Sequence, residues 1–269
     1  MSTRIELGPR IGLIGDAHGN ISFLTAAAKQ LASEGVTSLV QLGDFGVIWG
    51  RTPRRRSNLE ELERILAELS LPMFVVLGNH EDFDEIANIS PNADGDRRVS
   101  DHVLLLARAG RAVVGSTRVG WLSGAGSIDY PSRTPGKGWW DAEIPSDAEV
   151  APLYDGESVS VLFAHDALTT SGLVEKLSRS AHLWDPLGLA YAQRTQDEFT
   201  RRALPALTSG AVVLSGHYHF PHREVATMDG GRVEVEQVIF NAEWGPLSLG
   251  VLAIGDRGVE VEHLSVVRR

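Results

Sequence analysis

Residues 11–44 read IGLIGDAHGNISFLTAAAKQLASEGVTSLVQLGD and contain the first complete unit of the predicted fold. Two apolar runs within them, Ile11–Gly15 and Ser38–Leu42, have the length and composition of buried strands. Between the runs, Ile21–Glu34 places its apolar side chains at helical spacing, and Gly35 follows as a C-terminal stop. The stretch therefore predicts a β-α-β unit and, with it, parallel strands.

The alternation of strand and helix patterns continues along the chain. Short apolar runs of the same character occur at Met73–Leu77, Ser158–Ala164 and Ala211–Ser215. A further helix is predicted where Ser57 and Glu60 match a capping box. Thr195 and Glu198 repeat that pattern, and Pro205 should end or kink the helix that they start. Strands joined by helices favour a parallel sheet.

A second group of apolar segments is connected through turns rather than helices. These segments are Val103–Leu106, Ala112–Val114, Val119–Leu122, Arg232–Phe240 and Ser248–Ile254. Turn signals stand at residues 229–231 (DGG) and 256–258 (DRG). They predict a second, more antiparallel sheet that faces the first. The expected fold class is α/β, a four-layer α-β-β-α sandwich of two mixed sheets, with residues 1–269 forming a single domain.

Two long segments, residues 124–150 and 168–193, show no clear periodic pattern and are long for plain connections. Functional lids and packed surface loops are both open as interpretations. The first segment contains Trp139 and Trp140. Together with Trp49, these side chains either stack on a planar leaving group or pack the loop.

The composition is that of a soluble globular protein. Of 269 residues, 43% are hydrophobic and 22% are charged, and no apolar run has the length of a secretory signal or a membrane span. We therefore expect a soluble, cytoplasmic protein with no membrane partner. The formal net charge of −10 does not favour nucleic acid as a partner. The basic run Arg51–Arg56 is either a solvated loop or a ligand site.

Potential metal ligands follow the ends of five predicted strands. They are Asp16, His18, Asp44, Asn79, His165, His217 and His219. Because ligands of α/β sheets bind beyond the carboxyl ends of the strands, these side chains should meet in one place. The Gly or Ala before each group lets the backbone come close to a bound ion. The chain has no Cys, and nitrogen and oxygen donors suit Mn²⁺, Fe²⁺ or Fe³⁺, Zn²⁺, Co²⁺ or Ni²⁺ better than Ca²⁺.

The order of these motifs is informative in itself. The motifs are Gly15-Asp16-Ala17-His18, Gly43-Asp44, Gly78-Asn79-His80-Glu81, His165 and Gly216-His217-Tyr218-His219. This ordered set resembles the calcineurin-like metallophosphoesterase superfamily. The resemblance implies the four-layer sandwich and a site for two divalent metal ions. Among the metals that suit the thiol-free donor set, Mn²⁺ is the first expectation.

The resemblance also implies a role for each matching residue. One metal is held by Asp16, His18 and His219, and the other by Asn79, His165 and His217. Asp44 bridges the two metals. A hydroxide bound to the metals is the implied nucleophile, and it attacks the phosphorus of a phosphomonoester or phosphodiester in line.

His80 is the candidate general acid, because a protonated imidazole can supply the proton that an alkoxide leaving group needs. The alternative is that His80 only binds phosphate. Many family members carry Gly-Asp-x-x-Asp-Arg-Gly, whereas Val47 stands where the acidic partner of this histidine would be. Protein phosphatase activity is therefore not favoured. Arg51, Arg133 and Asn79 are the candidate contacts to the substrate.

The expected partner is a small phosphorylated molecule, with a nucleotide among the candidates, because an acidic chain does not attract a polymer of phosphates. A nuclease that acts on DNA or RNA is the alternative, and a non-catalytic protein-binding scaffold is a further one. The presence of every ligand position argues against the scaffold. The other histidines are interpreted as packed or surface residues: His102, His182, His222 and His263.

Overall fold

The first β-α-β unit has the arrangement that its sequence predicts. The computed structural model describes residues 5–49, 55–255 and 258–267. Strand β1 (Arg10–Ile14) pairs in parallel with β2 (Ser38–Gln41), and helix α1 (Ile21–Ser33) connects them. The side chain of Asn20 caps α1 by accepting a hydrogen bond from the backbone N–H of Phe23 at 3.1 Å. After α1, Gly35 adopts a positive φ of 73°, which is the usual geometry of a glycine that ends a helix.

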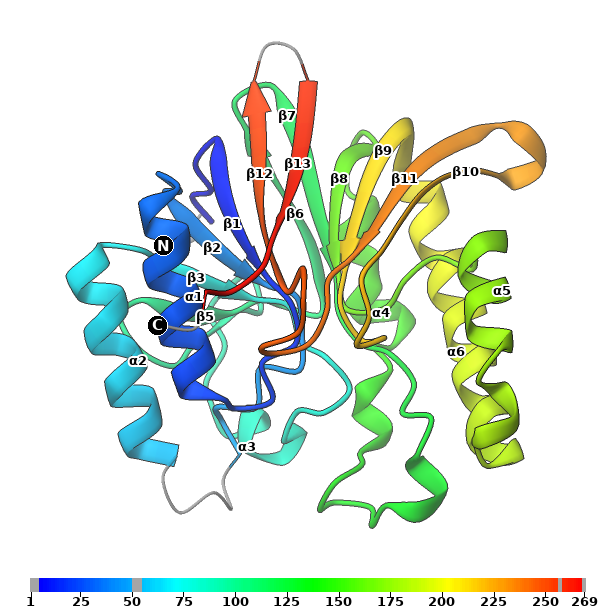
Figure 1. Ribbon diagram of the computed structural model, residues 1–269, viewed down its shortest axis with the longest axis horizontal. Helices are drawn as coiled ribbons and strands as arrows, with labels where there is room; N and C mark the ends of the chain where they lie inside the picture. Colours follow the sequence, from blue (N-terminus) through cyan, green and yellow to red (C-terminus); the bar gives the residue numbers. More distant parts are fainter. Residues whose placement is uncertain (1–4, 50–54, 256–257, 268–269) are drawn as a thin grey trace.

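The first sheet has seven strands in the order β13-β12-β1-β2-β3-β5-β4 (Figure 1). Its other strands are β3 (Met73–Val75), β4 (Arg97–Arg98), β5 (Val103–Leu105), β12 (Leu249–Gly255) and β13 (Gly258–Leu264). The central strands β1, β2, β3 and β5 run parallel. Strands β12, β13 and β4 are antiparallel to their neighbours, so the sheet is mixed.

The second sheet has six strands in the order β10-β11-β9-β8-β7-β6. These strands are β6 (Ala109–Val114), β7 (Thr117–Leu122), β8 (Val159–Ala164), β9 (Leu207–Ser215), β10 (His222–Met228) and β11 (Val233–Ile239). Strands β7, β8, β9 and β11 run parallel, and the two edge strands are antiparallel to them. This sheet is therefore also mixed.

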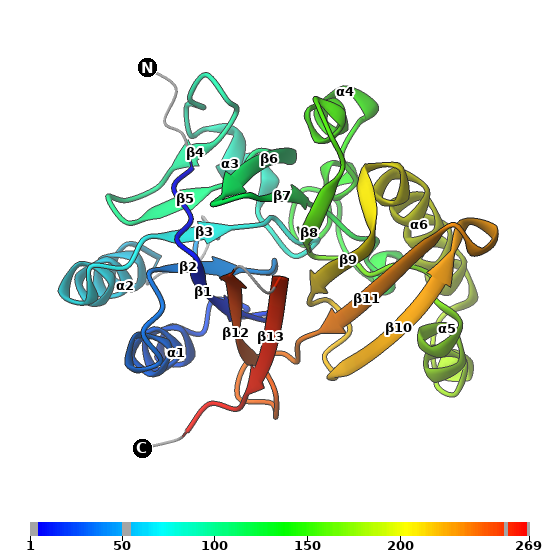
Figure 2. The same cartoon turned by 90° about the horizontal axis from the view of Figure 1, so that it is seen from above.

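Helices cover the outer faces of both sheets (Figures 1 and 2). The helices besides α1 are α2 (Arg55–Leu69), α3 (Phe83–Ala87), α4 (Asp147–Val150), α5 (Ser171–Ser178) and α6 (Pro186–Ala203). Helices α1 and α2 lie on the first sheet, while α5 and α6 lie on the side of the second sheet. The predicted four-layer sandwich of two mixed sheets is confirmed.

Alternating side chains of the strands supply separate layers of the core. Leu39 of β2 packs under α1 and α2, whereas the next residue, Val40, points into the layer between the two sheets. In the second sheet, Phe163 of β8 faces the first sheet, and its neighbour Leu162 packs toward α6. The central strands of both sheets are therefore buried on both faces, which explains why they read as continuous apolar runs.

The predicted division of strands between the sheets is wrong in part. The segments at 103–106 and 248–254 were assigned to the second sheet, but β5 and β12 belong to the first. Conversely, β8 and β9 were grouped with the helix-connected strands, but they form the centre of the second sheet. Because every central strand is buried on both faces, its apolar pattern carries no information about which sheet it joins.

Two predicted helix starts are also wrong. Helix α2 already includes Arg55, so Ser57 lies within it rather than at its cap. Helix α6 begins at Pro186, where Asp185 accepts hydrogen bonds from the first backbone N–H groups, and Thr195 lies in its middle. The side chain of Thr195 bonds to carbonyls of the preceding turn instead. The predicted end is confirmed, because α6 stops before Pro205.

The two unassigned segments contain short ordered elements. Residues 124–150 hold 3-10 turns and α4, and residues 168–193 hold α5 and the first half of α6. The predicted turn at residues 229–231 connects β10 to β11. Residues 256–257 of the second predicted turn lie outside the described residues. Among the helices of the described ranges, none is long and apolar enough to cross a membrane.

Acid should weaken this fold through His263 of β13. Its ring packs edge-on against Phe240 with centroids 4.6 Å apart, and its Nε2 is buried without a hydrogen-bond partner. Burial, assisted by the charge of Arg223, lowers the pKa of His263 to about 4. The unfolded chain, with a histidine pKa of about 6.5, binds more protons between these two values, so the free energy of unfolding falls as the pH drops through that window.

We predict that His263→Phe removes this loss. Urea unfolding at pH 7, 5.5 and 4.5 should show the variant gaining about 1 kcal/mol on the parent between pH 7 and 4.5, after allowance for partial exposure of the ring. His182→Phe, at an exposed position, is the control and should show no such trend. A difference between parent and His263→Phe that does not change with pH would contradict the prediction.

Candidate metal centre

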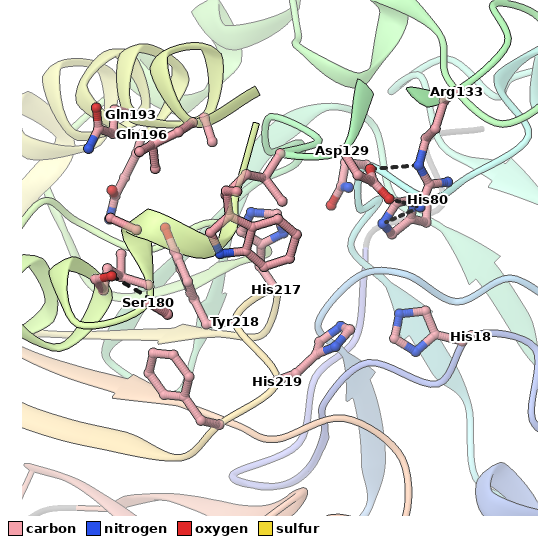
Figure 3. Close-up of a pocket in the computed structure, with 18 of the residues that line it drawn as sticks. His18, His80, Asp129, Arg133, Ser180, Gln193, Gln196, His217, Tyr218 and His219 are labelled. Carbon is pink, nitrogen blue, oxygen red and sulfur yellow. Dashed lines mark hydrogen bonds and ion pairs between the residues drawn. The ribbon is translucent and has the colours of Figure 1, made fainter. Parts of the chain in front are cut away.

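The structure brings together seven side chains at one edge of the two sheets. Strands β1, β2 and β3 of the first sheet and β8 and β9 of the second end there, and the residues after them carry the predicted ligands. These ligands are Asp16, His18, Asp44, Asn79, His165, His217 and His219. Figure 3 shows three of the imidazoles, His18, His217 and His219, around the same pocket.

The first group within this cluster consists of four residues with close donor atoms. One ligand atom from each of Asp16, His18, Asp44 and His219 lies within 4.8 Å of all the others. Nε2 of His219 is 3.1 Å from Oδ2 of Asp16, and Nε2 of His18 is 3.4 Å from Oδ2 of Asp44. Both carboxylates are buried, while the two imidazoles are exposed toward the pocket.

The second group surrounds His165, which is fully buried. Its Nε2 lies 2.9 Å from Oδ1 of Asn79 and 3.2 Å from Oδ1 of Asp44. The ring of His217 stands edge-on to that of His165, with centroids 5.0 Å apart. Asp44 therefore belongs to both groups, since one of its oxygens faces His165 and the other faces His18.

Small residues allow these groups to approach one another. A Cβ added to Gly43, which has a φ of +99°, would lie 2.2 Å from Nδ1 of His165. A Cβ on Gly78 would lie 2.1 Å from Oδ1 of Asp44. Positive φ is unfavourable for residues other than glycine. Four of the seven cluster residues adopt it: His18, Asp44, His217 and His219. The loops of this site thus hold an unfavourable backbone geometry at four positions.

Hydrogen-bond acceptors face both ring nitrogens of His165. Nδ1 lies 2.8 Å from the carbonyl oxygen of Leu42, which only accepts, so Nδ1 carries a proton. Nε2 then faces the oxygens of Asn79 and Asp44 either with a second proton or with a cation in its place. Burial lowers the pKa of His165, but the carboxylates of Asp44 and Asp16 outweigh it and raise the pKa to about 10.

His18 has the same kind of arrangement on the other side of Asp44. Its Nδ1 lies 2.9 Å from Oε2 of Glu243, and its Nε2 faces Asp44. Burial lowers the pKa of His18, but Asp44 and Glu243 outweigh it and raise the pKa to about 9. A histidine whose second nitrogen bonds to a carboxylate or a backbone carbonyl is the usual form of a metal ligand. The donor set and its geometry therefore fit divalent cations.

Glu243 was not expected from the sequence. It follows β11 in a loop without a recognisable motif, more than 200 residues from His18.

Glu81, in contrast, was visible within the Gly-Asn-His-Glu motif, although no role was predicted for it. Its carboxylate accepts from the backbone N–H groups of Phe45 at 2.8 Å and Gly46 at 3.2 Å, and so fixes the loop after Asp44. Burial, with the charge of Asp44, raises the pKa of Glu81 to about 7.

A buried chain of hydrogen bonds orients the amide of Asn79. Nδ2 of Asn79 donates to Oγ of Ser127 at 2.9 Å, and this hydroxyl donates to Oε2 of Glu143 at 2.5 Å. Glu143 also accepts from Trp139 and Tyr191. Because the carboxylate takes the only hydroxyl proton, the oxygen of Ser127 is left as an acceptor, and Oδ1 of Asn79 must point into the cluster. Neither Ser127 nor Glu143 was predicted, since both lie in the unassigned segment 124–150.

His80 has a cation beside it in place of the usual carboxylate. Its Nε2 lies 3.4 Å from Nη2 of Arg133, and Asp129 holds that guanidinium with two contacts of 2.6 Å (Figure 3). Val47 is buried and apolar. Burial lowers the pKa of His80, and the guanidinium adds to that direction against the opposing charge of Asp44. Arg133, a predicted substrate contact, lines the same cavity as the cluster, whereas Arg51 lies outside the described residues.

The tryptophans of the predicted stacking site have packing roles. Trp140 is buried and makes edge-on contacts with Trp49 and Phe83, with ring centroids 6.2 and 6.5 Å apart. Trp139 donates its Nε1 to Glu143 at 2.9 Å. The alternative that these side chains pack the loop is therefore the one that the structure favours. Trp49 also reaches the cavity wall, where its Nε1 donates to the backbone carbonyl of His80.

The remaining histidines lie away from the cavity. His102 bonds to Glu63 at 2.6 Å, and His222 bonds to Glu224 at 2.8 Å. His263 packs on an aromatic ring, and His182 is exposed. None of the four lines the cavity beside the cluster. They are packed or surface residues, as interpreted from the sequence.

Comparison with known proteins identifies the family. The family model described as calcineurin-like phosphoesterase matches residues 9–221. The chain belongs to this family, and the resemblance based on its motifs is confirmed. No curated protein matches the sequence significantly.

Solved structures share the fold at low sequence identity. The protein TT1561 of Thermus thermophilus is 14% identical, and the alignment covers 95% of this chain and 98% of that chain with a TM-score of 0.51. A dimetal phosphatase from Danio rerio is also 14% identical, with 96% and 99% covered and a TM-score of 0.49. At 14% identity the match to TT1561 shows the fold alone, and the match to the phosphatase is only a similarity.

The protonation of the cluster leads to a measurable prediction. In the metal-free protein His18 and His165, with pKa values of about 9 and 10, are protonated at pH 7. A cation that binds their Nε2 atoms must displace those protons, so Mn²⁺ binding at pH 7 should release about two protons. Calorimetric titration of Mn²⁺ in two buffers of different ionisation enthalpy measures this number. A binding enthalpy that is the same in both buffers would contradict it.

Proposed function

We propose that this chain hydrolyses a phosphomonoester or phosphodiester of a small molecule, with two divalent cations bound at the candidate metal centre. The observation that carries the proposal is the position of Asp44. Its two oxygens face imidazoles of different groups, His165 and His18, at 3.2 and 3.4 Å. Its Oδ2 is buried and accepts no hydrogen bond. A carboxylate in this position is suited to bridge two cations.

The proposed ligand sets follow the two groups of the cluster. Asp16, His18 and His219 would hold one cation, Asn79, His165 and His217 would hold the other, and Asp44 would be shared. Mn²⁺ is the proposed ion, and Fe, Zn, Co and Ni are alternatives for the same donors. Such cations, when bound, activate a water and neutralise charge on the phosphoryl oxygens.

The protein groups beside the cluster have complementary tasks. Arg133 is positioned by Asp129 to contact a phosphoryl oxygen, because its guanidinium lines the cavity next to His80. Ser127 and Glu143 hold the amide of Asn79 in the orientation that exposes its oxygen to a cation. His80 lines the cavity beside the cluster, and we propose that its imidazolium form supplies the proton to the leaving oxygen. The lowered pKa makes this form a stronger acid than a free histidine, while less of it is present at pH 7.

The first prediction concerns Asp44 and the cations. Asp44→Asn keeps the shape but removes the charge that two cations would share, so kcat/KM should fall by more than about 1000-fold, equivalent to several kcal/mol of transition-state stabilisation. Dialysis of the parent against a chelator should abolish hydrolysis of an aryl phosphate, and Mn²⁺ should restore it. Asp101→Asn, at an exposed carboxylate, is the control and should behave as the parent. Full turnover in excess chelator would refute the proposal.

The second prediction separates the two possible roles of His80. His80→Ala should reduce kcat on an alkyl phosphate by about 100-fold or more, because an alkoxide cannot leave without a proton, while an aryl phosphate should lose much less. His182→Ala serves as the exposed control. Equal losses on both substrates would leave His80 a phosphate contact only and would exclude the acid role.

A further inference from the structure

A cavity of about 1060 Å³ extends from the candidate metal centre to helices α5 and α6. His18 and His80 border it at one end. Gln193, Gln196 and Ser180 border it at the other, across the pocket in Figure 3. The far half of this cavity takes no part in the chemistry proposed above, so it is free to bind the organic part of a substrate.

The far half has aromatic and apolar walls. Tyr218 and Phe220 extend a row of rings from His217, with centroid separations of 4.9 and 5.9 Å. Val174 and Trp184 also line the cavity, and they expose 45% and 44% of their surface. Large apolar surface left open inside a concave site is typical of a ligand site. Aromatic side chains favour a planar ligand that can stack on them.

One buried polar group points to the kind of ligand. Gln196 of α6 lines the cavity with only 6% of its surface exposed, and its Nε2 has no hydrogen-bond partner. A buried amide N–H without a partner is costly, and an acceptor on a ligand would satisfy it. Gln193 adds a second amide three residues earlier, on the same side of the helix. An alkyl chain offers no such acceptor, whereas a nucleobase carries several.

The charges of the cavity limit the number of phosphates. Among the described residues that line it, Arg133 is the only Lys or Arg, and Asp129 already holds it beside His80. Asp197 adds a carboxylate to the far half. Lys176 of α5 lies behind this wall, where its Nζ is 3.9 Å from the ring centroid of Phe220 and donates to the backbone carbonyl of Pro221. A second phosphate or a nucleic acid strand would have to compete for that cation with the contacts it already makes. The cavity therefore suits an uncharged organic group.

We propose that the far half of the cavity binds the nucleoside part of a phosphoester with a single phosphoryl group, with the base against Tyr218 and Phe220 and an acceptor atom on the amide of Gln196. This inference rests on the proposed function, because it places the phosphoryl group at the metal centre. The metal centre alone does not distinguish one phosphoester from another, whereas this inference specifies a nucleoside as the organic part of the substrate.

The direct test is the binding of adenosine, which has no phosphate and does not depend on turnover. Calorimetric titration should show adenosine bound by the full-length parent. Gln196→Met keeps the size of the side chain without the donor and should weaken binding about tenfold. Ala192→Trp, one turn earlier on the cavity wall, should abolish it by filling the space. Arg201→Leu, an exposed residue of α6 outside the cavity, is the control, and thermal midpoints verify that each variant folds.

A kinetic test separates this inference from the proposed function. In Gln196→Met the ratio of kcat/KM for adenosine 5′-monophosphate to that for glycerol 2-phosphate should fall about tenfold, and in Arg201→Leu it should not change. Failure of the parent to bind adenosine, an unchanged ratio, or a preference for dodecyl phosphate would overturn the nucleoside assignment. Binding of adenosine by the parent without hydrolysis of any ester would support the pocket and reject the hydrolase.

Discussion

The structure depends on one electrostatic constraint, which is the crowding of oxygen acceptors around His165 and Asp44. The ring of His165 faces a backbone carbonyl on one side and oxygens of Asn79 and Asp44 on the other. In the buried site a single imidazole proton cannot satisfy all of these atoms. Positive charge must be present, either as protons on the histidines or as bound cations, and His18 repeats the arrangement on the opposite side. Bound cations would satisfy the same acceptors while the histidines stay neutral. The other residues of the site can therefore be understood by how they hold and orient the ligands of those cations.

The two-sheet architecture makes this crowding possible. Strands from both sheets end at a common edge, so carboxylates that follow β1 and β2 meet imidazoles that follow β8 and β9. Left-handed backbone at Asp44 and close contacts at Gly43 and Gly78 are tolerated because the strands before them are anchored in a core that is buried on both faces. Outside the strands, the carboxylates of Glu81, Glu143 and Glu243 fix the loops and the side chains of the cluster.

The sequence predicted the cluster better than it predicted the sheets. Each ligand lies one to four residues beyond a strand, so local patterns sufficed for residues such as Asp16 and His217. Sheet membership was wrong for β5, β8, β9 and β12, since strands buried on both faces look alike in sequence. The sequence does carry a signal for the start of α6, because Asp185 followed by Pro186 is an N-cap with a first-turn proline; the capping-box pattern at Thr195 and Glu198 lies inside the helix and is misleading. Supporting residues such as Ser127 and Glu243 have no motif and are brought to the site only by tertiary folding.

The central claim is that Asp44 lies between two cations. Anomalous diffraction from crystals of the full-length protein grown with Mn²⁺ measures this directly. The account predicts two peaks about 3.5–4 Å apart with Asp44 between them, one near His18 and one near His165. A single peak that does not contact Asp44, or no peak at the cluster at a saturating concentration of Mn²⁺, would contradict it.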